Sequence, residues 1–154
     1  MNSEGNKMKD KEYMELALSF AKKAGEKGDV PVGAVIVLGD KIIGCGYNKR
    51  EEKKNALLHA EICAINEACE NIGSWRLTGA TMYVTLEPCP MCAGAVINSR
   101  ISRVVFGAYD EKAGCFGSAD NFSLKSFNHK PQLIGGFMQE ECAAILKDFF
   151  AKKR

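Results

Sequence analysis

The stretch over residues 81–108 constrains the fold more than any other part of the sequence, because strand, helix and strand follow one another without interruption. Thr81–Leu86 and Arg103–Ala108 are short runs rich in β-branched and aromatic residues, which is typical of strands. A helix is expected over residues 90–98, since Pro90 suits a first helical position. Two strands joined by a crossover helix in one sheet run parallel. The sequence therefore predicts a sheet that contains a parallel pair.

Further strands and helices are expected on both sides of this unit. They are a helix over residues 10–27, a strand over 32–38, its antiparallel partner Lys41–Tyr47 after a Gly39-Asp40 turn, a helix over 59–71, a short strand over 132–135 and a final helix Gln139–Lys152. In the helix over 59–71, the side chains expected to face the core are Ile62, Ile65, Ala68 and Cys69. The predicted architecture is a three-layer α/β/α sandwich over one central, mixed, five-stranded sheet.

Length and composition fit a single globular domain over residues 1–154, with 46% hydrophobic and 26% charged residues. Residues 1–10 are polar without an apolar period, so we expect a frayed terminus with no role in the fold. The sequence has no apolar run long enough to cross a membrane and no signal-peptide core, which favours a cytoplasmic location. Its seven cysteines, an odd number, are therefore interpreted as reduced thiols.

Four side chains carry the strongest chemical signal: His59 and Glu61 in a His-Ala-Glu turn, and Cys89 and Cys92 in Pro-Cys-Pro-Met-Cys. Two thiolates and an imidazole are ligands that zinc prefers, and they fill three of its four tetrahedral positions. The fourth is left for water, whose pKa the metal lowers to the neutral range. Glu61 is not needed as a ligand and can accept the proton of that water. The pattern predicts one catalytic Zn²⁺ per chain and zinc-dependent hydrolysis.

Both motifs are expected at helix starts, so that two helix N-termini converge on one metal and favour the thiolate form of the cysteines. A structural zinc site is the alternative. Its fourth ligand could be Cys45, Cys63, Cys115 or His129. Zinc ribbons normally have two Cys-x-x-Cys pairs, whereas this chain has one, which favours the catalytic interpretation.

The net charge of +2 is too small to indicate nucleic-acid binding by itself. Residues 147–154 nevertheless combine basic side chains with Phe149 and Phe150. Such a patch could hold phosphates and stack a base. Alternatively, the phenylalanines belong to the buried face of a helix and the lysines to its solvated end, where they also suit the helix dipole.

Beyond the zinc motif, several segments resemble one family of enzymes. They are residues 30–34 (VPVGA), 73–77 (GSWRL), 81–89 (TMYVTLEPC), 91–95 (MCAGA), 103–108 (RVVFGA) and 127–129 (FNH). Together they resemble the bacterial tRNA-specific adenosine deaminases, members of the zinc-dependent nucleoside and nucleotide deaminase superfamily with a cytidine-deaminase-like fold. The resemblance implies hydrolysis of adenosine to inosine at the wobble position (34) of a tRNA anticodon, with release of ammonia. It also implies that Glu61 protonates N1 of the adenine ring.

By position, the resemblance carries substrate-binding roles to further residues. Asn48 matches an asparagine that contacts the target base, although an asparagine after a strand is also a common turn residue. Asp110 and Lys112 match positions beside the anticodon loop, and Asn128 matches one that touches neighbouring nucleotides. Without the resemblance these three would be read as solvated loop residues.

The resemblance also implies an aromatic pair near the RNA, at Phe149 and Phe150, and a homodimer in which the partner chain helps to build the RNA site. Two other functions stay open. One is a deaminase of a free base or nucleotide such as guanine, cytosine or deoxycytidylate, which shares the zinc motif but needs no basic patch. The other is a zinc-containing RNA-binding module without catalysis, which leaves the position of Glu61 unexplained.

Overall fold

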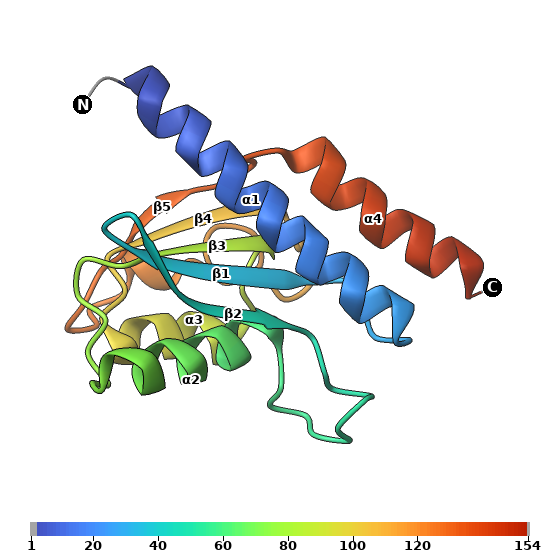
Figure 1. Ribbon diagram of the computed structural model, residues 1–154, viewed down its shortest axis with the longest axis horizontal. Coiled ribbons are helices and arrows are strands. Elements are labelled where there is room, and N and C mark those ends of the chain that lie inside the picture. Colours follow the sequence, from blue (N-terminus) through green and yellow to red (C-terminus); the bar gives the residue numbers. More distant parts are fainter. Residues whose placement is uncertain (1–2, 154) are drawn as a thin grey trace.

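One mixed sheet of five strands lies at the centre of the protein (Figure 1). The structure, a computed structural model, describes the backbone of residues 3–153 and the side chains of residues 9–153. The strands are β1 (Gly33–Leu38), β2 (Lys41–Tyr47), β3 (Thr81–Leu86), β4 (Arg103–Ala108) and β5 (Gln132–Ile134). The helices are α1 (Ser3–Glu26), α2 (Ala60–Ile72), α3 (Pro90–Ser99) and α4 (Gln139–Lys152), with a short 3₁₀ turn at Phe122–Leu124.

The strands are arranged in the order β2-β1-β3-β4-β5. β1 is antiparallel to both of its neighbours, whereas β3, β4 and β5 run parallel. Helices α2 and α3 cover one face of the sheet, and α1 and α4 cover the other (Figure 1). The predicted parallel pair, the mixed sheet and the three-layer sandwich are therefore confirmed.

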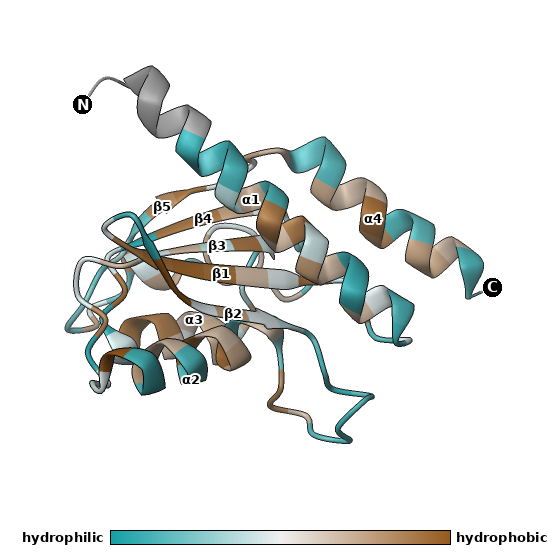
Figure 2. Cartoon of the chain, in the orientation of Figure 1, coloured by the Kyte–Doolittle hydropathy of each residue, from teal (hydrophilic) through white to brown (hydrophobic). Residues whose placement is uncertain are grey.

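The core occupies both interfaces between the sheet and its helices. Val84, Val104 and Phe106 are buried on the side of α2 and α3, while Tyr83 and Val105 are buried on the side of α1 and α4. The strands are mainly apolar, and the loop between β2 and α2 is mainly hydrophilic (Figure 2). Within the described part of the chain, we find no helix that is both long and apolar enough to cross a membrane.

Helix α2 approaches strand β2 unusually closely, because the strand has no side chains at the contact. A Cβ atom at Gly44 would collide with the carbonyl oxygen of Ala64, and one at Gly46 would collide with that of Ala60. On the opposite face, a Cβ at Gly33 would collide with the backbone of α1 at Ala17. Glycine in these strands therefore lets helix backbones lie directly on the sheet.

The residues of α2 that face the sheet differ from the prediction. Ala60, Ala64 and Ala68 are completely buried, whereas Ile62 and Ile65 are only partly buried. Of the four residues expected to point inward, only Ala68 does so fully, and Cys69 is also partly buried. The reason is geometric: a helix that rests on glycine leaves room for methyl groups but not for branched side chains.

Asp10, predicted to be the last residue of a frayed terminus with no role in the fold, lies in α1 and does have such a role. The Asp10 side chain is buried and accepts a hydrogen bond from the Tyr83 hydroxyl at 2.6 Å. Arg103 forms an ion pair with it, with Nη2 2.6 Å from Oδ2. These partners lie 73 and 93 positions away in the sequence, so apolar periodicity could not reveal them. Residues 1 and 2 lie outside the described part.

Replacing Gly46 with alanine should destabilise the protein, because the added methyl group forces α2 away from β2. We expect the free energy of unfolding to fall by about 1–3 kcal/mol, measured by urea denaturation. Gly25→Ala is the matched control, since its Cβ would make only an ordinary contact of 3.5 Å with Pro31. In α1 that change should be neutral or stabilising by up to about 1 kcal/mol. Equal stabilities of Gly46→Ala and wild type would show that the close contact is not required.

Candidate metal centre and active-site cavity

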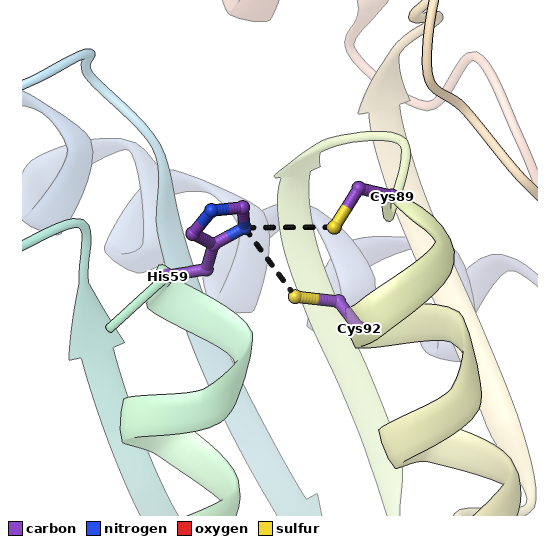
Figure 3. Close-up of side chains that lie close together, drawn as sticks. All are labelled: His59, Cys89 and Cys92. Carbon is purple, nitrogen blue, oxygen red and sulfur yellow. Dashed lines mark hydrogen bonds between the residues drawn. The ribbon is translucent and has the colours of Figure 1, made fainter. Parts of the chain in front are cut away.

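Three potential metal ligands converge where two helices begin. His59 is the N-cap of α2 and Cys89 is the N-cap of α3, both with extended backbone, and Cys92 follows in the first turn of α3. Their ligand atoms all lie within 4.8 Å of one another. The Nδ1 atom of His59 lies 3.6 Å from each of the two sulfur atoms (Figure 3). The structure thus brings together the three residues predicted to bind metal.

The spacing of these atoms fits a tetrahedral zinc ion. A nitrogen at about 2.0 Å and a sulfur at about 2.3 Å from one zinc ion lie about 3.5 Å apart in tetrahedral geometry. Among the described residues, no other histidine, cysteine or acidic side chain joins the cluster. His129, one of the candidate fourth ligands, instead donates its Nε2 proton to the carbonyl oxygen of Ile101 at 2.7 Å. The cluster therefore offers three ligands and an open position, as catalytic rather than structural sites do.

The three ligands perturb one another's proton affinity. The Cys92 thiol, with further help from His59, holds the pKa of Cys89 at about 4. The thiolate of Cys89 in turn raises the pKa of Cys92 and of His59. Both helix N-termini point their positive ends at the cluster, which also favours negative sulfur. A dication in contact with both sulfurs would lower the pKa of each thiol, so the site is built to collect a metal cation.

Glu61 lies in the first turn of α2, two residues after His59, and its side chain is 4% exposed. Burial raises its pKa to about 7. Glu61 lines a cavity of about 190 Å³ together with His59 and Cys89. The remaining wall comes from residues 30, 32, 48, 50, 60, 86, 87, 110 and 113. A carboxyl group that faces both the metal ligands and a cavity can exchange a proton with a molecule held there.

Asn48 is buried, lines the cavity and is held by the backbone on both sides. Its amide nitrogen donates to the Val30 carbonyl at 3.2 Å, and its Oδ1 accepts from the Arg50 N–H at 3.1 Å. The second bond is a local turn contact, as the turn interpretation predicted. One amide proton and one oxygen lone pair stay available, so the side chain can also form hydrogen bonds with a ligand in the cavity.

Sequence reasoning overlooked Glu87, although this buried side chain organises one wall of the cavity. Its Oε1 accepts from the Asp110 N–H at 3.1 Å and from the Ser118 hydroxyl at 2.5 Å. Its Oε2 accepts from the N–H groups of Phe116 and Ser118, each at 3.0 Å. A Cβ at Gly114 would collide with the carboxylate, so the loop is wrapped around it. The sequence feature that could have revealed Glu87 is its position, as a glutamate at the end of a buried strand and two residues before Cys89.

Asp110 and Lys112 belong to the loop that Glu87 holds. Asp110 lines the cavity, and its Oδ1 accepts hydrogen bonds from the N–H groups of Lys112 and Ala113 at 3.1 and 3.2 Å. The side chain of Lys112 is exposed. The loop thus places an acidic group in the cavity and a basic one outside it.

The other three predicted substrate residues lie outside the cavity. Phe149 is half-buried and Phe150 is 50% exposed, with ring centroids 5.4 Å apart near the end of α4. Phe149 lines a shallow cavity beside Pro31, next to the residues that form the main cavity. Asn128 is exposed, and its neighbour His129 is bound to Ile101, which precedes β4. Asn128 is therefore near the start of β4. Cys89 instead follows the end of β3, which runs parallel to β4.

Comparison with known proteins identifies relatives over nearly the whole chain. Residues 8–154 match the family model of the MafB19-like deaminases. The chain is 51% identical over 146 residues to a tRNA-specific adenosine deaminase of Bacillus subtilis, covering 94% of this chain and 91% of the relative. A structure from a study of A-to-I editing by tRNA:A34 deaminases has 44% identity and a TM-score of 0.85, covering 88% of this chain and 99% of that one.

A guanine deaminase from Bacillus subtilis is a more distant neighbour, with 33% identity and a TM-score of 0.60 over 71% of this chain and 66% of that one. The family model and the identity over nearly full length agree with the geometry of the site. This chain belongs to the MafB19-like deaminases and, within them, to the family of the tRNA-specific adenosine deaminases.

Proposed function

We propose that this protein hydrolyses adenosine to inosine at the wobble position (34) of a tRNA anticodon and releases ammonia. The observation that carries the proposal is a three-ligand metal cluster beside a buried carboxylate, in a chain about half identical to a tRNA-specific adenosine deaminase. The substrate follows from that relative and from the A34 deaminase structure. As a tRNA-modifying enzyme, the protein would act in the cytoplasm.

His59, Cys89 and Cys92 would hold one Zn²⁺ per chain. When bound, zinc would supply a Lewis acid that lowers the pKa of a water molecule to the neutral range. Glu61 is the proton carrier: it faces the cavity, is not a ligand and is shielded from bulk water. It would accept a proton from the attacking water, give one to N1 of the adenine ring and then assist the departure of ammonia.

The cavity would hold the adenine base against Asn48 and Glu61, with Asp110 as another part of the wall. A nucleotide can enter such a cavity only after leaving its stack, which costs little in an unpaired anticodon loop. We propose that Lys112, Phe149 and Phe150 contact the RNA outside the cavity. Their exposure suits charge contacts and stacking with neighbouring nucleotides.

We further propose a homodimer in which Asn128 acts on the RNA bound by the partner subunit. Asn128 lies near the start of β4, and the cavity lies beyond its end at Ala108. A strand of that length spans about 16 Å. Within one protomer, Asn128 and the cavity are therefore too far apart to contact adjacent nucleotides. A second copy would bring Asn128 to the cavity and complete the RNA site.

A free-base deaminase is the second candidate, because a guanine deaminase shares the fold and a third of the aligned residues. That enzyme would need only the closed part of the cavity, with no role for exposed residues such as Lys112 and Phe150. The alternative of a zinc-containing RNA-binding module leaves unexplained a buried carboxylate beside an incomplete ligand set.

Ammonia release separates these functions. We expect release from an anticodon stem-loop with adenosine at position 34 and none from free adenosine, guanine or cytidine, measured by a coupled ammonia assay. Glu61→Gln is the matched control, because it keeps the shape and the metal ligands but removes the proton carrier. Its rate should fall about 10³-fold or more. Release from free guanine alone would support the second candidate, and no release from any substrate would contradict both enzymes.

Metal analysis should find about one zinc ion per chain, as three protein ligands and one open position require. Removal with a chelator should abolish deamination, and added Zn²⁺ should restore it. Cys92→Ser should lose the metal and the activity. Cys115→Ala should retain both, because Cys115 is a buried thiol outside the ligand set. Equal metal loss in the two variants, at unchanged circular dichroism, would instead indicate a closed structural site.

The role of Asn128 can be tested by subunit complementation. Asn128→Ala should lower kcat/KM about tenfold through the loss of a polar RNA contact. A purified heterodimer of one Glu61→Gln chain and one Asn128→Ala chain then contains one intact composite site. We expect about half the wild-type activity per dimer if Asn128 acts across the interface. Activity no higher than that of the Asn128→Ala homodimer would contradict action in trans. Sedimentation that shows only monomer would contradict the proposed dimer itself.

A further inference from the structure

Three lysine ammonium groups surround the ring of one buried tyrosine at the end of β2. The Nζ atoms of Lys23, Lys27 and Lys49 lie 5.3, 5.6 and 4.8 Å from the centroid of Tyr47, all within the range of a cation–π interaction. Lys23 belongs to the last turn of α1, Lys27 follows that helix, and Lys49 follows β2. We call Tyr47 and these three lysines the Tyr47 lysine cluster.

The cluster carries more positive charge than its surroundings neutralise. Lys27 is paired with Glu52 at 2.7 Å. Over residues 9–153, neither Lys23 nor Lys49 has a carboxylate oxygen within 4.0 Å. Like charges gathered around one ring repel one another, and a ring face compensates only part of that cost. An anion placed between the ammonium groups would relieve the repulsion.

The cluster adjoins the cavity through four consecutive residues. Asn48 and Arg50 line the cavity, while Tyr47 and Lys49 belong to the cluster. The Asn48 side chain is also tied to Val30, another residue of the cavity wall. A base held beside Asn48 would therefore lie close to the backbone of Lys49, which brings the flanking phosphates within reach of the cluster in the binding mode that we infer.

The chemistry of the cluster suits a phosphate rather than a base. Tyr47 is only 8% exposed, so its ring is not accessible for stacking. The side chains of Lys23 and Lys27 are exposed, and that of Lys49 is partly so. Ammonium groups are point charges that bind phosphate oxygens without reading sequence.

We propose that the Tyr47 lysine cluster binds the phosphate backbone of the RNA strand that flanks the target nucleotide. The inference rests on the proposed function, since it requires RNA in the neighbouring cavity. Tyr47 holds the ammonium groups together, and the phosphates supply the missing negative charge. Because phosphate contacts contribute affinity and orientation, the cluster should affect KM and its salt dependence rather than kcat.

The test measures KM and kcat on the anticodon stem-loop at 50 and 200 mM salt, for wild type, Lys23→Ala and Lys49→Ala. Each lost phosphate contact should make the rise in KM over this range about threefold smaller than in wild type, with kcat unchanged. Lys23→Arg and Lys49→Arg should restore the wild-type salt dependence. Lys41→Ala is the matched control, an exposed lysine at the start of the same strand, and it should behave like wild type.

Direct binding separates this inference from the proposed function. Fluorescence anisotropy with labelled stem-loop and the Glu61→Gln protein measures affinity without turnover. If wild type deaminates the stem-loop but the lysine variants keep the wild-type salt dependence of binding and KM, the inference is overturned and the function stands. A lowered melting temperature with unchanged KM would overturn it as well, by showing a purely stabilising contact. If wild type neither binds nor deaminates the stem-loop, both the inference and the proposed function are contradicted.

Discussion

The contact between α2 and β2 determines where the chemistry of this protein can take place. Because Gly44 and Gly46 have no side chains, the helix lies directly on the strand, and its N-terminus is fixed relative to the sheet. His59 caps that N-terminus, and Cys89 caps the next helix on the same face. Two helix ends thus direct partial positive charge at one point, where thiolates and a carboxylate would otherwise repel one another. The ligand geometry follows from backbone packing rather than from the ligands alone.

Glu87 joins this metal cluster to the wall of the cavity. It is two residues from Cys89, and its carboxylate accepts four hydrogen bonds from the loop that contains Asp110 and Ser118. A shift of the cysteine turn would therefore move the loop, and a change in the loop would strain the turn. Buried and fully hydrogen-bonded, the carboxylate makes the two parts one rigid unit. Such rigidity suits the proposed site, in which a base would be held against a proton carrier.

Local signals predicted most of the fold, whereas distant partners could not be predicted. Strand patterns, the proline at the start of α3 and the ligand motifs each depend on a few adjacent residues, and the structure brings the three ligands together as expected. Asp10 and Glu87 act through partners between 23 and 93 positions away, and no local pattern marks them. The rule that large apolar residues face the core also failed for α2, because the opposing strand presents glycine.

The choice between a free base and a tRNA cannot be made by the metal centre, since a guanine deaminase shares this fold with a third of the aligned residues. A buried cavity reads only the base and the groups within reach of Asn48 and Asp110. Discrimination in favour of RNA must therefore come from exposed groups at the rim, where a free base makes no contact. The proposed candidates are the ammonium groups around Tyr47 and the exposed ring of Phe150. In the proposed arrangement the buried residues would set the reaction, and the exposed ones would set the size and charge of the molecule that reaches them.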